Sequence, residues 1–236
     1  MKKILCLVVL LILSSIGVAF SQSAPPNMPH YDSKIAHFGI SFGYNQFYSN
    51  MIEKEFRPYQ DTIMGFNSDR NSGFQLMFIT DLRLLSFLNL RFTPGVTFGD
   101  RRLNFYEYNK DGEFMIKSTS LEAIYVEMPL EFKIRSKRWR DMRPYLIAGG
   151  KYAYDLGSIK RKKANPDDVM LKIDNSEIFY TLGAGVDFYL PYFKFGVELK
   201  TSYGLTNILL PEHHTMYSDV LDKIRTQVFY INLTFE

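Results

Sequence analysis

The sequence predicts an all-β protein: an eight-stranded antiparallel transmembrane β-barrel that follows a cleaved signal peptide. Three features support this prediction: long segments in which apolar and polar residues strictly alternate, the number of such segments, and an apolar leader at the amino terminus. Between Phe193 and Leu205 the odd positions are apolar except Thr201, and the even positions are charged or small. Side chains on a strand point alternately to opposite faces, and a membrane-spanning strand needs about 9–11 residues. The segment therefore predicts a strand with one face toward lipid and one toward a lumen.

Apolar and polar residues alternate in the same way in other segments of the chain. The number of these segments favours a barrel over a soluble sheet with one solvated face. The predicted strands are Ala36–Asn45, Gly73–Leu82, Leu88–Phe105, Ala123–Arg135, Arg143–Leu156, Ser176–Leu190, Phe193–Leu205 and Thr226–Phe235. The last of them places an aromatic residue, Phe235, beside the carboxyl end of the chain. This resembles the carboxyl-terminal strand signal by which outer-membrane barrels are recognised for insertion.

The connections between these strands alternate in length. The long, polar ones are Gln46–Ser72, Tyr106–Glu122, Gly157–Asn175 and Thr206–Arg225, and the tight ones are Arg83–Phe87, Ser136–Met142 and Pro191–Tyr192. Outer-membrane barrels put short turns in the periplasm and long loops outside, and an even strand number leaves both chain ends on one side. We therefore expect an outer-membrane protein of a diderm bacterium with both termini in the periplasm.

The amino terminus agrees with that destination. Lys2 and Lys3 precede an apolar run from Ile4 to Leu13, and Ala19-Phe20-Ser21 provides small residues at a cleavage site. This pattern predicts a signal peptide over residues 1–21. The alternative is an uncleaved anchor helix, which the polar and small residues after Leu13 disfavour.

The mature chain is then expected to begin at Gln22 with a periplasmic lead-in over residues 22–34, followed by the barrel over residues 35–236. Pro25, Pro26 and Pro29 predict an extended lead-in, because proline fixes φ and lacks a donor. Cleavage removes Cys6, the only cysteine, and reduces Lys+Arg from 28 to 26 against 25 Asp+Glu. A mature charge near +1 argues against nucleic acid as a partner.

Eight strands close a barrel whose interior is only wide enough to be filled by side chains, so no wide pore is expected. The predicted inward faces carry charges of both signs: Arg91, Glu127, Glu131, Lys133, Arg135, Lys151, Asp155, Asp187, Lys194, Glu198 and Lys200. Charges removed from water must pair or stay hydrated, which predicts a salt-bridged, partly wet plug. The fifth strand is ambiguous in parity from Pro144 to Ala148. We assign its odd positions inward because the other choice would put Lys151 and Asp155 into lipid.

The chemical motifs in the barrel segments each have a structural reading. The stretch from Gly39 to Gly43 matches the nucleophile elbow of hydrolases, but its alternation continues as a strand and no helix is predicted after it. Glu127 and Glu131 share a strand face and could act as paired carboxylates. Lys133 and Arg135 on the same face are the expected neutralising partners, which favours a structural network. Gly183 and Gly185 begin a dinucleotide-like pattern in which Phe188 replaces the third glycine.

The predicted loops hold the remaining candidates. Glu212, His213, His214 and Asp219 could bind a metal ion, against the simpler reading of a solvated external loop. The run from Lys160 to Lys163 is read as a solvated basic loop, with contact to anionic lipid headgroups as the alternative. No residue is assigned a catalytic, cofactor-binding or metal-binding role, and no cofactor is expected.

Several blocks of the sequence resemble the PorT (SprT) family. They are Ile35–Gly39, Ser72–Phe74, Asp81–Arg83, Asn89–Gly95, Asp187–Lys200 and Ser202–Gly204, of which Asp187–Lys200 is the most specific. The resemblance implies an outer-membrane barrel component of the type IX secretion system, which exports proteins with a carboxyl-terminal sorting domain and supports gliding motility where it occurs. It implies outer-membrane lipid and other type IX components as partners, and it carries over no catalytic residue or small-molecule substrate.

The sequence therefore favours a non-enzymatic secretion component. The alternative from another class is an outer-membrane lipid-modifying enzyme, for which His213, His214, Ser218 and Asp219 are the nearest candidate residues. A generic adhesive or structural barrel is the third reading, and only the family blocks separate it from the first.

Overall fold

The computed structural model describes residues 27–54, 63–108, 114–157, 174–209 and 221–236. Its elements are the 3₁₀ helix η1 (Tyr31–Ser33) and the strands β1 (Ala36–Glu53), β2 (Ile63–Asp69), β3 (Asn71–Arg83), β4 (Leu88–Phe92), β5 (Gly95–Tyr108), β6 (Phe114–Arg135), β7 (Met142–Asp155), β8 (Ser176–Tyr189), β9 (Lys194–Gly204) and β10 (Leu221–Phe235). In this part of the chain, no helix is long and apolar enough to cross a membrane.

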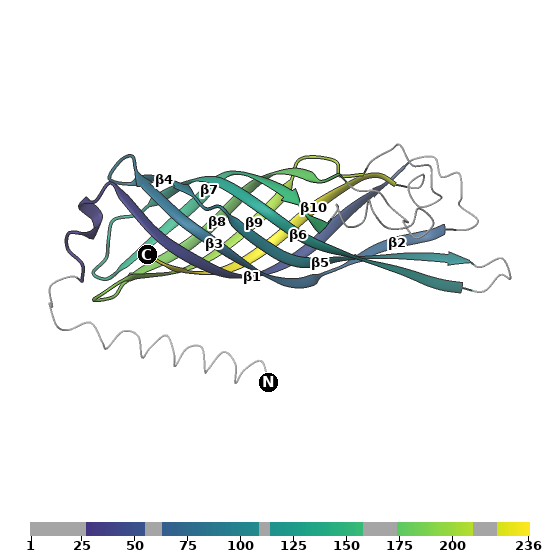
Figure 1. The fold of residues 1–236 in the computed structure, drawn as a ribbon, viewed down its shortest axis with the longest axis horizontal. Helices are drawn as coiled ribbons and strands as arrows, with labels where there is room; N and C mark the ends of the chain where they lie inside the picture. Colours follow the sequence, from purple (N-terminus) through teal and green to yellow (C-terminus); the bar gives the residue numbers. More distant parts are fainter. Residues whose placement is uncertain (1–26, 55–62, 109–113, 158–173, 210–220) are drawn as a thin grey trace, which may run out of the picture.

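The strands form one closed antiparallel barrel (Figure 1). Each strand pairs with its neighbours in order, and β1 closes the barrel by pairing with both β10 and β3. The segments β2 and β3 both pair with β5, and only Arg70 separates them. Likewise β4 and β5 both lie between β3 and β6. The ten described strand segments therefore make eight barrel strands, which confirms the predicted fold class.

The interruption between β4 and β5 follows from proline chemistry. Pro94 has no N–H to give to the ladder. Its carbonyl still accepts a hydrogen bond from the Phe78 N–H at 2.8 Å, and the Thr93 N–H donates to the Pro129 carbonyl at 3.1 Å. The strand therefore crosses this point without losing its neighbours.

The inward and outward faces alternate as predicted. In β9 the even residues from Lys194 to Gly204 are buried, whereas Leu199 is 51% exposed on the outer face. In β7 the side chains of Tyr145, Lys151 and Asp155 are buried, so the odd positions face inward. The choice made for the ambiguous fifth strand is confirmed.

The strands are longer than predicted on the side of the long connections. β1 continues to Glu53, β6 already begins at Phe114 and β10 begins at Leu221. The predicted loops Gln46–Ser72, Tyr106–Glu122 and Thr206–Arg225 therefore contain strand, and β2 lies wholly within the first of them. The prediction stopped where apolar alternation stops, but backbone pairing continues beyond the lipid-facing band, where an apolar outer face is not required.

The two ends of the barrel differ (Figure 1). At one end, which we call the terminal mouth, lie η1 and the last residue, Glu236, together with the tight turns. At the opposite end, the far end, β2, β5 and β6 project beyond the barrel wall. An apolar layer crosses the lumen toward the far end, and its members are Phe47, Tyr125, Ala153, Phe179, Val228 and Tyr230.

Candidate functional site

The barrel interior is rich in charged side chains. The buried basic side chains are Arg91, Arg101, Lys133, Arg135, Arg143, Lys151, Lys194 and Lys200. The buried acidic side chains are Asp81, Glu127, Glu131, Asp155, Glu177, Asp187, Glu198 and Glu236. All eleven charged residues predicted to face inward are among these sixteen. Within the described residues the two signs are equal in number, as expected for charges that must pair in a low-dielectric interior.

Arg91 on β4 is the centre of this network. Its guanidinium donates to Asp81 at 3.1 Å, to Glu236 at 2.9 Å and to Glu198. Asn89 also donates to Asp81, at 2.5 Å. These partners come from different strands around the wall, so the arginine ties opposite sides of the barrel together.

Lysines connect the next carboxylates. Lys194 donates to Glu236 at 2.7 Å and lies 3.6 Å from Asp187, which also accepts from Lys133 at 2.7 Å. Nearer the middle of the barrel, Lys200 lies 3.3 Å from Glu131.

Tyr145 on β7 extends over the neighbouring strand β8 to the same network. Its hydroxyl donates to Glu198 at 2.8 Å. Its ring occupies the space beside Gly185, where an added Cβ would lie 2.5 Å from the ring. Glycine at this position therefore makes room for an aromatic ring inside a narrow barrel, which accounts for part of the dinucleotide-like pattern.

Further toward the far end, two smaller groups continue the network. Lys151 donates to Glu127 at 2.7 Å and to the Tyr230 hydroxyl at 2.6 Å. Arg101 donates to Glu177 at 2.5 Å, and the Tyr125 hydroxyl donates to the same carboxylate at 2.8 Å.

The paired-carboxylate reading of Glu127 and Glu131 does not hold, because the two bind different lysines, Lys151 and Lys200. The expectation that Lys133 and Arg135 neutralise them was wrong. Lys133 pairs with Asp187 and Arg135 with Asp32. Residues on one strand face lie along the wall, whereas an opposite charge on a neighbouring or facing strand can approach head-on.

The centre of the barrel keeps one small polar void of about 10 Å³. Its lining includes Ser41, Thr93, Thr234 and Arg91, and each contributes a buried polar atom without a protein partner. A void of this size, with polar walls, suits about one water molecule. The described interior is therefore filled by ion-paired side chains, as the sequence predicted, and leaves room for about one water molecule at this void.

Residues Asn27–Lys34, which we call the strap, fold into the terminal mouth. We expected an extended lead-in, but Tyr31–Ser33 form a 3₁₀ turn and Tyr31 is 7% exposed. The Tyr31 ring stacks on His37 with centroids 4.2 Å apart and meets Tyr189 edge-on at 5.8 Å. Burial raises the pKa of the Tyr31 phenol above its ordinary value. Burial of this ring compensates for the conformational entropy that the strap loses when it becomes ordered. The prolines on which the extended lead-in was predicted give no information on this burial.

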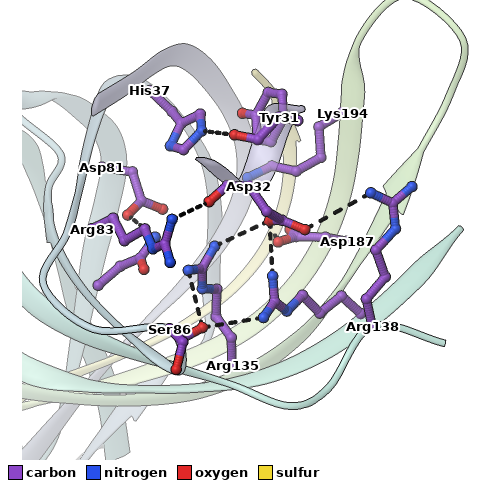
Figure 2. A network of polar contacts seen from close by, with 12 residues as sticks. Tyr31, Asp32, His37, Asp81, Arg83, Ser86, Arg135, Arg138, Asp187 and Lys194 are labelled. Atoms are coloured by element: carbon purple, nitrogen blue, oxygen red, sulfur yellow. Dashed lines mark hydrogen bonds and ion pairs between the residues drawn. The ribbon is translucent and has the colours of Figure 1, made fainter. Parts of the chain in front are cut away.

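Asp32 enters a set of three arginines, Arg135, Arg138 and Arg143, which we call the cradle. Figure 2 labels Arg135 and Arg138 beside Asp32. Its carboxylate lies 2.8 Å from Arg143, 3.4 Å from Arg135 and 3.8 Å from Arg138. The Tyr189 hydroxyl donates to it as well, at 3.1 Å. Charge-assisted bonds of this kind are the stronger ones, so Asp32 is the main polar anchor of the strap.

Other side chains bind the main chain of the strap. Arg83 donates to the Asp32 carbonyl at 2.6 Å, and His37 is 2.9 Å from the Tyr31 carbonyl (Figure 2). Arg138 donates to the carbonyls of Asn27 and Met28. This site could not be predicted from the sequence, because Asp32 and the cradle are more than a hundred residues apart and the arginines stand in or beside a turn that could equally be solvated.

The remaining sequence candidates are placed as follows. Ser41, in the elbow-like stretch, lies within β1 with its side chain buried in the lumen, so the hydrolase reading is wrong. Gly183 and Gly185 lie within β8, where no helix follows to bind a phosphate. Among the described residues, no group of three or more metal-ligating side chains comes together. Several predictions lie outside the described residues: the predicted signal peptide 1–21, part of the predicted lead-in, the basic run Lys160–Lys163, and the loop residues Glu212, His213, His214, Ser218 and Asp219.

Comparison with known proteins agrees with this geometry. Residues 20–210 match the family model described as outer membrane protein beta-barrel domain. The chain belongs to this family. It is an outer-membrane β-barrel protein, and its apolar outer face is the surface that meets lipid.

Solved outer-membrane proteins are among the structures to which this chain is similar, at low sequence identity. Neisserial surface protein A is 11% identical over 85% of this chain and 98% of that one, with a TM-score of 0.42. OprG from Pseudomonas aeruginosa is 13% identical over 85% of this chain and 94% of that one, with a TM-score of 0.46. Ail of Yersinia pestis, in complex with the heparin analogue sucrose octasulfate, is 12% identical over 86% and 99%, with a TM-score of 0.37. No curated protein sequence matches the chain.

Proposed function

We propose that this outer-membrane barrel is a non-enzymatic component required for type IX protein secretion. In this role it supports export of proteins with a carboxyl-terminal sorting domain, and gliding motility where that occurs. The proposal rests on the sequence blocks that resemble the PorT family, above all Asp187–Lys200. Its partners would be outer-membrane lipid and other type IX components, with no nucleic acid and no small-molecule substrate.

The observation that supports the proposal most is the filled lumen. The family-like block contributes Asp187, Lys194, Glu198 and Lys200 to the buried ion-pair network. A barrel whose described lumen is filled by paired charges leaves no protein-sized channel through its centre. Such a protein acts through its two ends and its outer surface, as a scaffold or an assembly factor does.

The proposed orientation places the terminal mouth in the periplasm. Short turns face the periplasm in outer-membrane barrels, and the terminal mouth has the short turns. The strap would then meet periplasmic components, and the projecting strands β2, β5 and β6 would face the cell exterior.

The lipid-modifying alternative needs a serine, a histidine and a carboxylate brought together at the outer rim. Its candidates, His213, His214, Ser218 and Asp219, lie outside the described residues, and the described carboxylates Glu127 and Glu131 are ion-paired. No observation on the described residues favours this alternative, and none separates a generic structural barrel from the secretion component.

A gene deletion with complementation tests the proposal. Loss of the gene should trap proteins with carboxyl-terminal sorting domains in the periplasm. A His213→Ala, His214→Ala, Ser218→Ala triple variant, first shown to insert normally, should restore export as fully as the wild type. A deletion strain that exports its cargo normally but shows altered lipid acylation would instead support the enzyme.

A further inference from the structure

We propose that the terminal mouth is a binding site for an acidic peptide segment with an aromatic residue beside its carboxylate. The strap occupies this site in the structure and would compete with such a segment from a partner protein. The inference rests on the geometry of the mouth and not on the secretion role, and its test uses no secretion assay.

The first half of the site binds a carboxylate. Asp32 receives hydrogen bonds or ion pairs from the three cradle arginines and from Tyr189. Arg135 and Arg143 belong to strands β6 and β7, and with the strap in place their side chains are 3% and 9% exposed, whereas the Asp32 side chain in the strap is 28% exposed. The receptor is therefore part of the wall, and the ligand group is the more accessible member of the pair.

The second half holds an aromatic ring next to that carboxylate. His37 stacks on Tyr31, Tyr189 contacts its edge, and the Lys194 ammonium lies 5.0 Å from the ring centroid. A cation this close to a ring adds to the attraction that burial provides. The adjacent order of aromatic and acidic residues is therefore what the mouth selects.

The mouth also binds backbone, which favours a peptide over a lipid headgroup. Arg83, His37 and Arg138 contact main-chain carbonyls of the strap, and Asn27 is held at both its N–H and its side chain. A phospholipid phosphate could satisfy the cradle, but it offers neither a row of carbonyls nor a ring for the slot beside His37.

The charge balance at the mouth also favours an acidic ligand. Arg83 and the three cradle arginines lie close to two carboxylates. One is Asp32 in the strap, and the other is Asp141 in the turn between β6 and β7. Deeper in the lumen, Asp81 and Asp187 face this group but already pair with Arg91, Lys133 and Lys194. When the strap is withdrawn, the cradle loses its nearest anion, and a carboxylate from another chain can replace it.

The test is binding of a fluorescein-labelled peptide, Asn-Met-Pro-His-Tyr-Asp-Ser, to the purified full barrel in detergent, read by anisotropy. A double variant, Tyr31→Ala with Asp32→Asn, weakens the strap and leaves the receptor intact. Competition from an attached segment lowers apparent affinity by the fraction of molecules with an open site, so the double variant should bind at least about tenfold more tightly than the wild type. Adding Arg143→Gln should abolish this gain, whereas the neighbouring exposed position, Arg140→Gln, should leave it unchanged.

Further arms identify the ligand chemistry and guard against misfolding. The peptide with asparagine in place of aspartate should bind at least about tenfold more weakly, and neither inorganic phosphate nor phosphatidylglycerol micelles should displace the acidic peptide. On the wild type, saturating unlabelled peptide should accelerate hydrogen exchange of the Tyr31, Ser33 and Lys34 amides, which are bonded within the strap. Equal binding by the wild type and a folded double variant, equal binding of both peptides, or unchanged exchange would overturn the proposal. Displacement by phosphatidylglycerol would assign the cradle to lipid instead.

Discussion

Replacing Arg91 with methionine tests whether the buried network holds the barrel together. The substitution keeps an apolar stem but removes the guanidinium from Asp81, Glu198 and Glu236, which are at most 2% exposed as side chains. Glu198 and Glu236 retain lysine partners, whereas the remaining described partner of Asp81 is the neutral amide of Asn89. Breaking a buried pair by removing one partner costs about 3–5 kcal/mol, and we expect a loss in that range.

The assay is equilibrium urea unfolding of the barrel in lipid vesicles, with the folded fraction read from its compact migration on unboiled gels. The difference in midpoint multiplied by the slope gives the free-energy change. Adding Asp81→Asn to Arg91→Met should restore part of the loss, because it removes the carboxylate left without a cation. Lys137→Met, in an exposed turn, is the control. The reasoning fails if Arg91→Met costs no more than this control, or if the double variant is less stable than the single one.

Three further predictions concern the wall. The purified protein should migrate compactly before heating and shift on boiling, because a closed barrel satisfies its backbone groups internally; extraction by carbonate alone would contradict this. Leu199→Arg places a charge on the lipid face between Ala184 and Ile231 and should cost about 2–4 kcal/mol in vesicle unfolding, whereas the turn variant Ser136→Arg should cost little; equal losses would argue against the assigned faces. Gly149→Ala puts a Cβ 2.6 Å from the Glu131 Cα and should cost about 1–3 kcal/mol, whereas at Gly150 the nearest atom is 3.8 Å away and the same change should be neutral; matching midpoints would refute the inferred close approach.

The fold could be predicted because barrel strands have a strict period of two. A shift by one residue would reverse every side chain, so the apolar and charged positions fix the face that each side chain takes. The same reasoning succeeded for the ambiguous fifth strand, where Lys151 and Asp155 decided which positions face inward. The strand ends could not be predicted in the same way, because beyond the lipid the pairing of β5 with β6 continues to Tyr108 and Phe114 without an alternating pattern.

The partners of the inward charges could not be predicted, because alternation says which way a side chain points and not what lies opposite. Glu127 illustrates this: Lys133 is close in sequence, but Lys151 reaches it from the next strand, where Pro129 and Lys151 are paired. The strap was missed for the same reason. Asp32 meets Arg135 and Arg143 only after all the intervening strands have closed the barrel.

The distribution of charge inside the barrel explains why the strap belongs to it. Among the described side chains, and with the Glu236–Lys194 pair counted in the lumen, six buried basic side chains lie behind the cradle against eight acidic ones, since Arg135 and Arg143 of the eight basic residues belong to the cradle. There, Arg83 and Arg138 join them against Asp32 and Asp141. The surplus of two cations at the mouth thus balances the surplus of two anions behind it. Loss of Asp32 from the cradle would raise the net positive charge of the mouth above the net negative charge of the lumen. Another carboxylate would restore the balance, and an acidic segment of a partner protein provides one.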